Sequence, residues 1–146
     1  MYPFDMPLDL LRKAKASGGN TIKLGLQSAD ESVLTNINRN PKTVIDAKML
    51  IRNAKKAGFL IYLDFIFGLP GETKESLVKN IKFSVKTNPA VAKFYKLDIL
   101  EGSELYNRAR QNMKITDLTD NEIRKFCKIA WKKFYFRPGK VFEFMR

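Results

Sequence analysis

The sequence contains no histidine and only one cysteine, Cys127. Without histidine, the chain cannot use histidine acid–base catalysis or a Ser–His or Cys–His nucleophile pair. One cysteine cannot form a disulfide within the chain, and this chain alone cannot build a multi-cysteine metal site or a zinc site of the usual Cys/His kind. With no base beside it, Cys127 is expected to be a small buried hydrophobic residue.

Long apolar runs are also absent. No segment approaches the roughly 20 apolar residues of a membrane-spanning helix. Residues 1–5 lack the basic and then apolar order of a secretory signal. We therefore expect no membrane span and a cytoplasmic location.

What is present is typical of a single packed domain with an excess of basic residues. The chain has 146 residues, of which 45% are hydrophobic and 12% aromatic, enough to fill one core. Its formal net charge is +12, and residues 121–146 supply half of it, with eight Lys and Arg against two Glu. Such a charge can attract nucleic acid, anionic lipid or acidic partners.

The apolar periodicity predicts helices and strands in alternation. Helices are expected over residues 8–15, 29–37, 43–57, 74–86, 103–111 and 119–136, and strands over 21–26, 59–67 and 91–100. The run 59–67 is almost continuously apolar, which is typical of a strand buried on both faces. Alternation with crossover-length connections favours parallel strands with helices outside them. Three strands cannot close a barrel, so they form either a small open sheet or half of something larger.

Three polar or glycine-rich patterns follow the expected strands. They are GLQS at residues 25–28, DFIFGLPGET at 64–73 and LEGSELY at 100–106. Functional groups of parallel α/β proteins lie at the carboxyl ends of the strands. All three patterns are therefore expected on one rim of the sheet.

These patterns, in this order, resemble the C-terminal half of a radical S-adenosylmethionine (SAM) enzyme barrel. Residues 36–39 (NINR) continue the first pattern as that superfamily often does, and 64–73 resemble its fifth-strand motif, whose backbone meets the SAM adenine. Residues 134–138 (FYFRP) resemble a tail of the cobalamin-binding branch. The likeness covers residues 8–146 and implies an α/β fold, half of a partial TIM-type (β/α)6 barrel with about three parallel strands, flanking helices and a C-terminal helix. Residues 1–118 would form the partial barrel, and 119–146 a basic aromatic helix and tail packed on it.

The chain departs from the family at the cluster site. Radical SAM enzymes hold a [4Fe-4S] cluster with three closely spaced cysteines, and these are absent here. The resemblance therefore implies a fragment, inactive alone, that helps position SAM and substrate for 5′-deoxyadenosyl radical chemistry. The [4Fe-4S] cluster and cobalamin would belong only to the complete protein. The substrate and the reaction subtype stay open.

The resemblance also implies cofactor-binding residues, but no catalytic residue and no metal ligand. Several have structural alternatives: helix capping for Ser28 and Glu72, simple solvation for Arg39, and an ion pair with a lysine for Asp64. The expected SAM-binding set is Gln27, Ser28, Arg39, Asp64, Ile66, Gly68 and Glu72.

An alternative function is a basic binding module for nucleic acid or a protein partner, without catalysis. The tail from Lys125 to Arg146 could bind RNA or a membrane surface, or pack on the barrel with its basic side outward, which is favoured. Its aromatic residues are Trp131, Phe134, Tyr135, Phe136, Phe142 and Phe144. The uncovered strand edges of a half-barrel predict a homo-oligomer or pairing with the missing N-terminal half.

Overall fold

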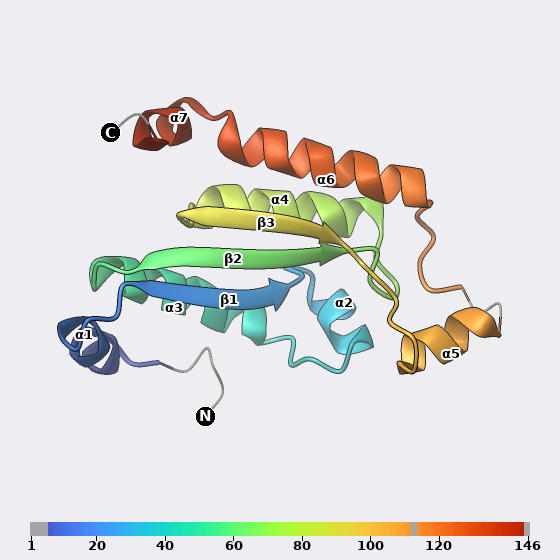
Figure 1. The fold of residues 1–146 in the computed structure, drawn as a ribbon, viewed down its shortest axis with the longest axis horizontal. Coiled ribbons are helices and arrows are strands. Elements are labelled where there is room, and N and C mark those ends of the chain that lie inside the picture. The colour runs from blue at the N-terminus through green and yellow to red at the C-terminus, as the bar shows by residue number, and fades with distance from the viewer. Residues whose placement is uncertain (1–5, 112–113, 145–146) are drawn as a thin grey trace.

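The computed structural model describes residues 6–111 and 114–144 (Figure 1). Residues 1–5, on which the expectation of no secretory signal depends, and the side chains of Phe142 and Phe144 lie outside this description. The elements follow the order α1 (Leu8–Ala16), β1 (Thr21–Gln27), α2 (Glu31–Asn36), α3 (Thr43–Lys56), β2 (Leu60–Phe67), α4 (Lys74–Thr87), β3 (Val91–Lys96), α5 (Glu104–Arg110), α6 (Asp120–Tyr135) and α7 (Pro138–Phe144).

The strands form one parallel sheet in the order β1-β2-β3. This confirms the predicted α/β architecture, with each strand entering the sheet beside the one before it. The register places Gly25 of β1 opposite Asp64 of β2, and Ile66 of β2 opposite Tyr95 of β3. β3 is shorter than predicted, because the exposed residues 98–100 leave the sheet toward α5.

The helices cover only one face of this sheet. Ile61, Leu63, Phe65 and Phe67 of β2 point into the core that the sheet shares with α1, α3, α4 and α6. The alternate residues of β2 face away from it, and Leu60 among them is 54% exposed. The prediction that residues 59–67 are buried on both faces is therefore wrong. Among the described residues, the second face has no covering helix, and we call it the open face.

α6 packs along β3 and α4 on the outer side of the molecule (Figure 1). The predicted capping box at its start is present, with Thr119 and Glu122 each accepting a hydrogen bond from the other's backbone N–H. Near its end, the Tyr135 hydroxyl donates to the Ala92 carbonyl at 2.9 Å and accepts from the Ala92 N–H at 3.3 Å. One side chain thus satisfies two backbone groups on the outer edge of β3.

The last helix, α7, was not expected from the sequence. It begins at Pro138, a residue that suits a first helical turn because that turn needs no donor from its N–H. Lys140 of this helix is buried, and its ammonium donates to the Pro89 carbonyl at 2.8 Å. Within 6–111 and 114–144, no helix is both long and apolar enough to cross a membrane.

Candidate ligand-binding face of the sheet

The open face carries polar side chains near the carboxyl ends of β1 and β2. Asp64 lies on this face in the middle of an otherwise apolar strand, and its Oδ2 is 3.4 Å from the Lys23 ammonium. Gln27 ends β1 at a β-bulge, where the pairing with β2 shifts register between Gly25 and Gln27. The bulge turns the end of the strand, and such irregularities recur next to functional sites.

Gln27 has a backbone conformation that is rare for its residue type. Its φ is +70°, in the left-handed region that side chains with a Cβ seldom adopt. Its side-chain amide folds back over Gly25, where a Cβ would lie only 2.8 Å from the Gln27 Nε2. Glycine at position 25 therefore leaves the room that this arrangement needs. The amide is thereby brought toward Asp64, the register partner of Gly25.

Gln27 and Asp64 each have one side-chain oxygen without a hydrogen-bond partner among the described residues. Gln27 Oε1 and Asp64 Oδ1 are the buried side-chain atoms in the described part of the chain that form no hydrogen bond. A buried acceptor without a donor costs about 1–3 kcal/mol, so such atoms mark a place where a donor is missing. Their position on adjacent strands predicts a ligand that presents N–H or O–H groups to the open face.

Ser28 and Glu72 belong to a different, internally paired group. The Ser28 hydroxyl donates to Asn80 Oδ1 at 3.2 Å, and the same oxygen accepts from the Ala29 N–H at 2.5 Å. Asn80 Nδ2 donates in turn to Glu72 Oε1 at 3.2 Å. One buried amide on α4 thus joins the loop after β1 to the loop after β2.

The second oxygen of Glu72 binds the backbone of its own loop. Oε2 accepts from the N–H groups of Gly68 at 2.5 Å and Leu69 at 3.3 Å. Burial raises the pKa of Glu72 to about 7, although these bonds and the one from Asn80 lower it. The internal contacts of Ser28 and Glu72 fit the structural alternatives for these residues, and their contact with a cofactor stays a prediction.

Gly68 also has a structural reason to be glycine. Its φ is +96°, and a Cβ there would lie 2.9 Å from Ile123 Cδ1 of α6. The left-handed φ disfavours any larger residue at this position, and the Ile123 side chain would also have to shift to admit one. With its N–H donated to Glu72, Gly68 offers a ligand no free N–H.

Arg39 and Ile66 take up different positions. The Arg39 guanidinium donates to the Gly25 carbonyl at 2.9 Å, so it reaches back to the strand that carries Gln27. Ile66 is half-buried on the open face, one alternation beyond Asp64. Of the predicted set, the structure thus gathers Gln27, Arg39, Asp64 and Ile66 around the open face, while Ser28, Gly68 and Glu72 form the loop network behind it.

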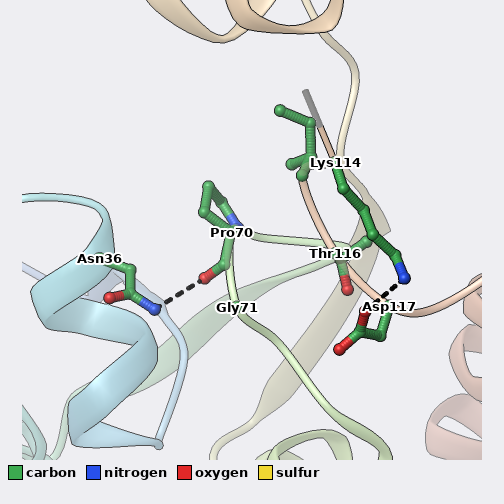
Figure 2. Close-up of a pocket in the computed structure, with 7 residues that line it drawn as sticks. Asn36, Pro70, Gly71, Lys114, Thr116 and Asp117 are labelled. Atoms are coloured by element: carbon green, nitrogen blue, oxygen red, sulfur yellow. Dashed lines mark hydrogen bonds and ion pairs between the residues drawn. The ribbon is translucent and has the colours of Figure 1, made fainter. Parts of the chain in front are cut away.

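A pocket of about 470 Å³ lies beside the loop 68–73 (Figure 2). It is lined by Asn36, Pro70, Gly71, Lys114, Ile115, Thr116 and Asp117, of which the first three belong to the segments 36–39 and 64–73 that carry the family resemblance. The Asn36 amide donates to the Pro70 carbonyl at 3.2 Å, and the Lys114 ammonium is 2.5 Å from Asp117 (Figure 2). Asn36 thus holds the loop from α2. On the other side, the Gly71 N–H donates to the Ile115 carbonyl at 3.1 Å, and the Thr116 hydroxyl donates to the Glu72 carbonyl at 2.8 Å.

Sequence reasoning missed Asn80. A signal for it does exist, because Ser76, Asn80 and Ser84 recur every four residues on α4 and all three are buried. Polar residues at that spacing lie on one side of a helix, here the side turned toward the sheet. This spacing therefore indicates a row of buried polar side chains along a helix face that is otherwise apolar.

The described residues do not fit an iron–sulfur cluster. They contain no group of three or more Cys, His, Asp or Glu side chains placed to hold a metal ion. Cys127 is half-buried against the core in α6, and burial raises the pKa of its thiol to about 11. A thiol that stays protonated at neutral pH is a poor ligand for iron.

Residues 3–84 match the family model of the radical SAM superfamily. A curated relative, an uncharacterized methyltransferase of Pyrococcus horikoshii, is 31% identical over 146 aligned residues, which cover 86% of this chain and 31% of the relative. The heme chaperone HemW of Buchnera aphidicola is 31% identical over 97 residues, covering 66% of this chain and 26% of that protein. The chain therefore spans about a third or less of the length of these relatives.

Two solved structures share the fold. Coproporphyrinogen III oxidase of Escherichia coli, described as a radical SAM enzyme, superposes with a TM-score of 0.70 at 26% identity, covering 89% of this chain and 30% of that one. The radical SAM methyltransferase TsrM of Kitasatospora setae, solved with cobalamin and a [4Fe-4S] cluster, gives 0.58 at 20% identity, covering 64% of this chain and 19% of that one. Both likenesses match the parallel sheet and its outer helices to part of a TIM-like barrel.

Proposed function

The chain belongs to the radical SAM superfamily, and we propose that its open sheet face forms one wall of a site for SAM and substrate. In this proposal Gln27 and Asp64 contact the ligand, and Arg39 and Ile66 border it. Ser28, Gly68 and Glu72 hold the loops that shape the rim.

The observation that carries the proposal is the pair of buried, unpaired acceptors, Gln27 Oε1 and Asp64 Oδ1. SAM presents matching donors in its ammonium group, its ribose hydroxyls and its adenine amine. It also carries a sulfonium charge, which a carboxylate attracts more strongly inside a partly buried site than in water. Asp64 is only 13% exposed, so its charge acts in such an environment.

Bound SAM would supply the 5′-deoxyadenosyl group for radical chemistry. The residues that the structure describes do not fit the [4Fe-4S] cluster that this chemistry uses. Their part is to bind and orient: Asp64 and Gln27 accept hydrogen bonds, and the left-handed backbone of Gln27 fixes the direction of its amide.

Isothermal titration of the purified chain with SAM tests the proposal. Asp64→Asn keeps the shape of the side chain and removes its charge, so we expect SAM affinity to fall about ten-fold or more, in line with a lost charged hydrogen bond. Asp46→Asn on α3 is the matched control, since it makes the same change far from the open face and should leave affinity unchanged. No saturable binding by the unaltered chain, or equal effects of both variants, would contradict the proposed site.

We further propose that β1 is the edge at which this sheet is extended. β1 pairs only with β2, so its other edge has no strand neighbour among the described residues. The outer edge of β3 differs, because Tyr135 already binds both backbone groups of Ala92. The partner would be a second copy of the chain or a segment carrying the remaining strands of the barrel. Light scattering tests the first choice: a dimer or larger assembly is expected, and a monomer at all concentrations would rule it out.

A further inference from the structure

The outer side of α6 presents aromatic side chains to solvent. Trp131, the one tryptophan of the sequence, is 51% exposed, and Phe136 just beyond the helix is 66% exposed. Trp is enriched at binding interfaces, and neighbouring exposed apolar side chains often mark an interaction surface. Neither side chain belongs to the open face or to the loops around it.

The aromatic rings brace one another. The Trp131 ring lies 5.2 Å from the Tyr135 ring in a tilted arrangement and 5.6 Å from the Phe136 ring edge-on. Tyr135 is itself fixed to β3 through Ala92. The indole is thus held from two sides while half of its surface stays open to solvent, which makes it a preformed stacking platform.

Lysines accompany these rings along the helix. Lys125, Lys128 and Lys132 are exposed, and none of them forms an ion pair or hydrogen bond with another described residue. Their spacing of three and four residues places them on one stripe, with Phe136 continuing it four residues later. At 1.5 Å per residue, the stripe from Lys125 to Phe136 is about 16 Å long.

No acidic residue interrupts this stripe. Residues 123–142 contain seven Lys and Arg and no Asp or Glu. The described carboxylates on the same helix, Asp120 and Glu122, lie in its first turn and are paired. Asp120 pairs with Lys96 and Arg124, each at 2.6 Å, and Glu122 pairs with Lys74 at 2.5 Å. Two other basic groups serve the fold instead, since Arg137 donates to the Val85 carbonyl and Lys140 to that of Pro89. The basic groups of this segment without an ion pair or hydrogen bond to a described residue are therefore the three stripe lysines and the exposed Lys133 beside them.

From this juxtaposition we infer that the stripe Lys125, Lys128, Trp131, Lys132 and Phe136 binds single-stranded nucleic acid. The lysines neutralise phosphates, and the exposed faces of Trp131 and Phe136 stack with bases. A row of lysines beside exposed aromatic rings matches a single nucleic-acid strand, in which phosphates alternate with unpaired bases. A duplex keeps its bases stacked on each other, so it offers the rings much less. This binding is separate from the SAM site, because it uses none of the open-face residues.

Intrinsic fluorescence tests the inference without any substitution, because Trp131 is the sole tryptophan. Titration with short oligouridylate or oligothymidylate should quench the emission as bases stack on the indole. The matching duplex should quench much less. Unchanged emission with both single strands would overturn the inference. Vesicles containing phosphatidylserine provide the competing probe: a blue shift with vesicles in place of quenching by oligonucleotides would assign the stripe to a membrane surface instead.

Substitutions that reverse the charge of one lysine test where the oligonucleotide binds. Anisotropy of a labelled oligouridylate should give a log–log salt slope near −2, because each of the three phosphate contacts contributes about 0.7 on a single strand. Lys128→Glu should lower the affinity and flatten that slope. Lys48→Glu on α3 changes net charge equally, and its side chain is exposed and far along the chain from the stripe. Equal losses in both variants would show a general charge effect and contradict a site on α6.

Substitution of Trp131 tests whether bases stack on its ring. Trp131→Ala should weaken oligouridylate binding by about 5-fold to 150-fold, the loss of 1–3 kcal/mol expected for one stacked base. The salt slope should stay as in the unaltered chain, because no phosphate contact is removed. An affinity unaffected by Trp131→Ala would contradict stacking.

Discussion

At the scale of single residues, Asn80 joins two loops of the rim, although the sequence did not single it out. Its oxygen accepts from Ser28 and Ala29 in the loop after β1, and its amide nitrogen donates to Glu72 in the loop after β2. Only a side chain with an acceptor and a donor at its end can do both. Asn80 therefore keeps the two loops of the rim in fixed relation.

Replacing Asn80 by alanine should destabilise the fold by about 3 kcal/mol or more. The change leaves the Ala29 N–H and Glu72 Oε1 without the partner they have in Asn80, and unsatisfied groups cost about 1–3 kcal/mol each. Ser84→Ala is the matched control on the same helix face, because that hydroxyl donates only to the Ile81 carbonyl one turn before it. Urea unfolding should separate the two variants clearly, and equal losses would show that the link between loops adds nothing.

Glu72 should make stability depend on pH. Its folded-state pKa of about 7 lies above the reference value of 4.5, so the folded chain binds the proton more tightly than the unfolded chain. This contribution is fully present below pH 4.5 and is lost as pH rises through 7, on the order of 3 kcal/mol in total. The pKa values of Asp30 and Glu122 are lowered, so these two groups change the stability only at pH values below that window.

Thermal unfolding of Glu72→Gln checks this sign. The variant cannot titrate at this position, so its midpoint should change less than that of the unaltered chain across the interval from pH 4.5 to 7. A steeper fall of stability in the variant, or identical slopes, would contradict a raised pKa at Glu72.

At the scale of elements, the contact of α6 with β3 protects one edge of the sheet. Unpaired backbone groups at a strand edge invite pairing with other chains. The Tyr135 hydroxyl occupies both such groups of Ala92, and the helix covers part of the strand beside it. This difference between the edges gives the sheet a closed side at β3 and an extendable side at β1.

Tyr135→Phe should reopen the β3 edge. Loss of the hydroxyl leaves the Ala92 N–H and carbonyl without this partner, which should cost about 1–2 kcal/mol. Tyr106→Phe serves as control, because the Tyr106 hydroxyl forms no hydrogen bond with another described residue. Urea unfolding measures the stability, and light scattering should show more association for Tyr135→Phe alone. If the two variants associate equally, the protective role of Tyr135 is wrong.

Elements were the easiest part to predict from the sequence. Apolar periodicity and capping residues placed α3, α4 and α6 to within one or two residues of their ends, since these signals are local. The exposed side of β2 was missed because a run of apolar letters does not reveal which face neighbouring helices cover. The Gln27 bulge and the Asn80 link could not be predicted, because both depend on pairing between distant segments.

At the scale of the whole molecule, the helices that share the core cover one face of the sheet, and Gln27 and Asp64 lie on the other. The strand-end residues predicted from the family resemblance divide accordingly. Gln27 and Asp64 reach the open face with free acceptors, whereas Ser28 and Glu72 support the rim from behind. The sequence pattern located the rim, and only the structure separates the residues that face a ligand from those that hold the loops.

The most direct test of this account maps SAM onto the chain by NMR. We predict that adding SAM to the ¹⁵N-labelled chain shifts the backbone signals of Gly25, Gln27 and Ile66 and the side-chain amide of Gln27, all on the open face. Signals from α3 on the covered side should stay in place. Shifts confined to the helices, or no shifts at saturating SAM, would contradict the claim that the open face of the sheet is the ligand-binding wall.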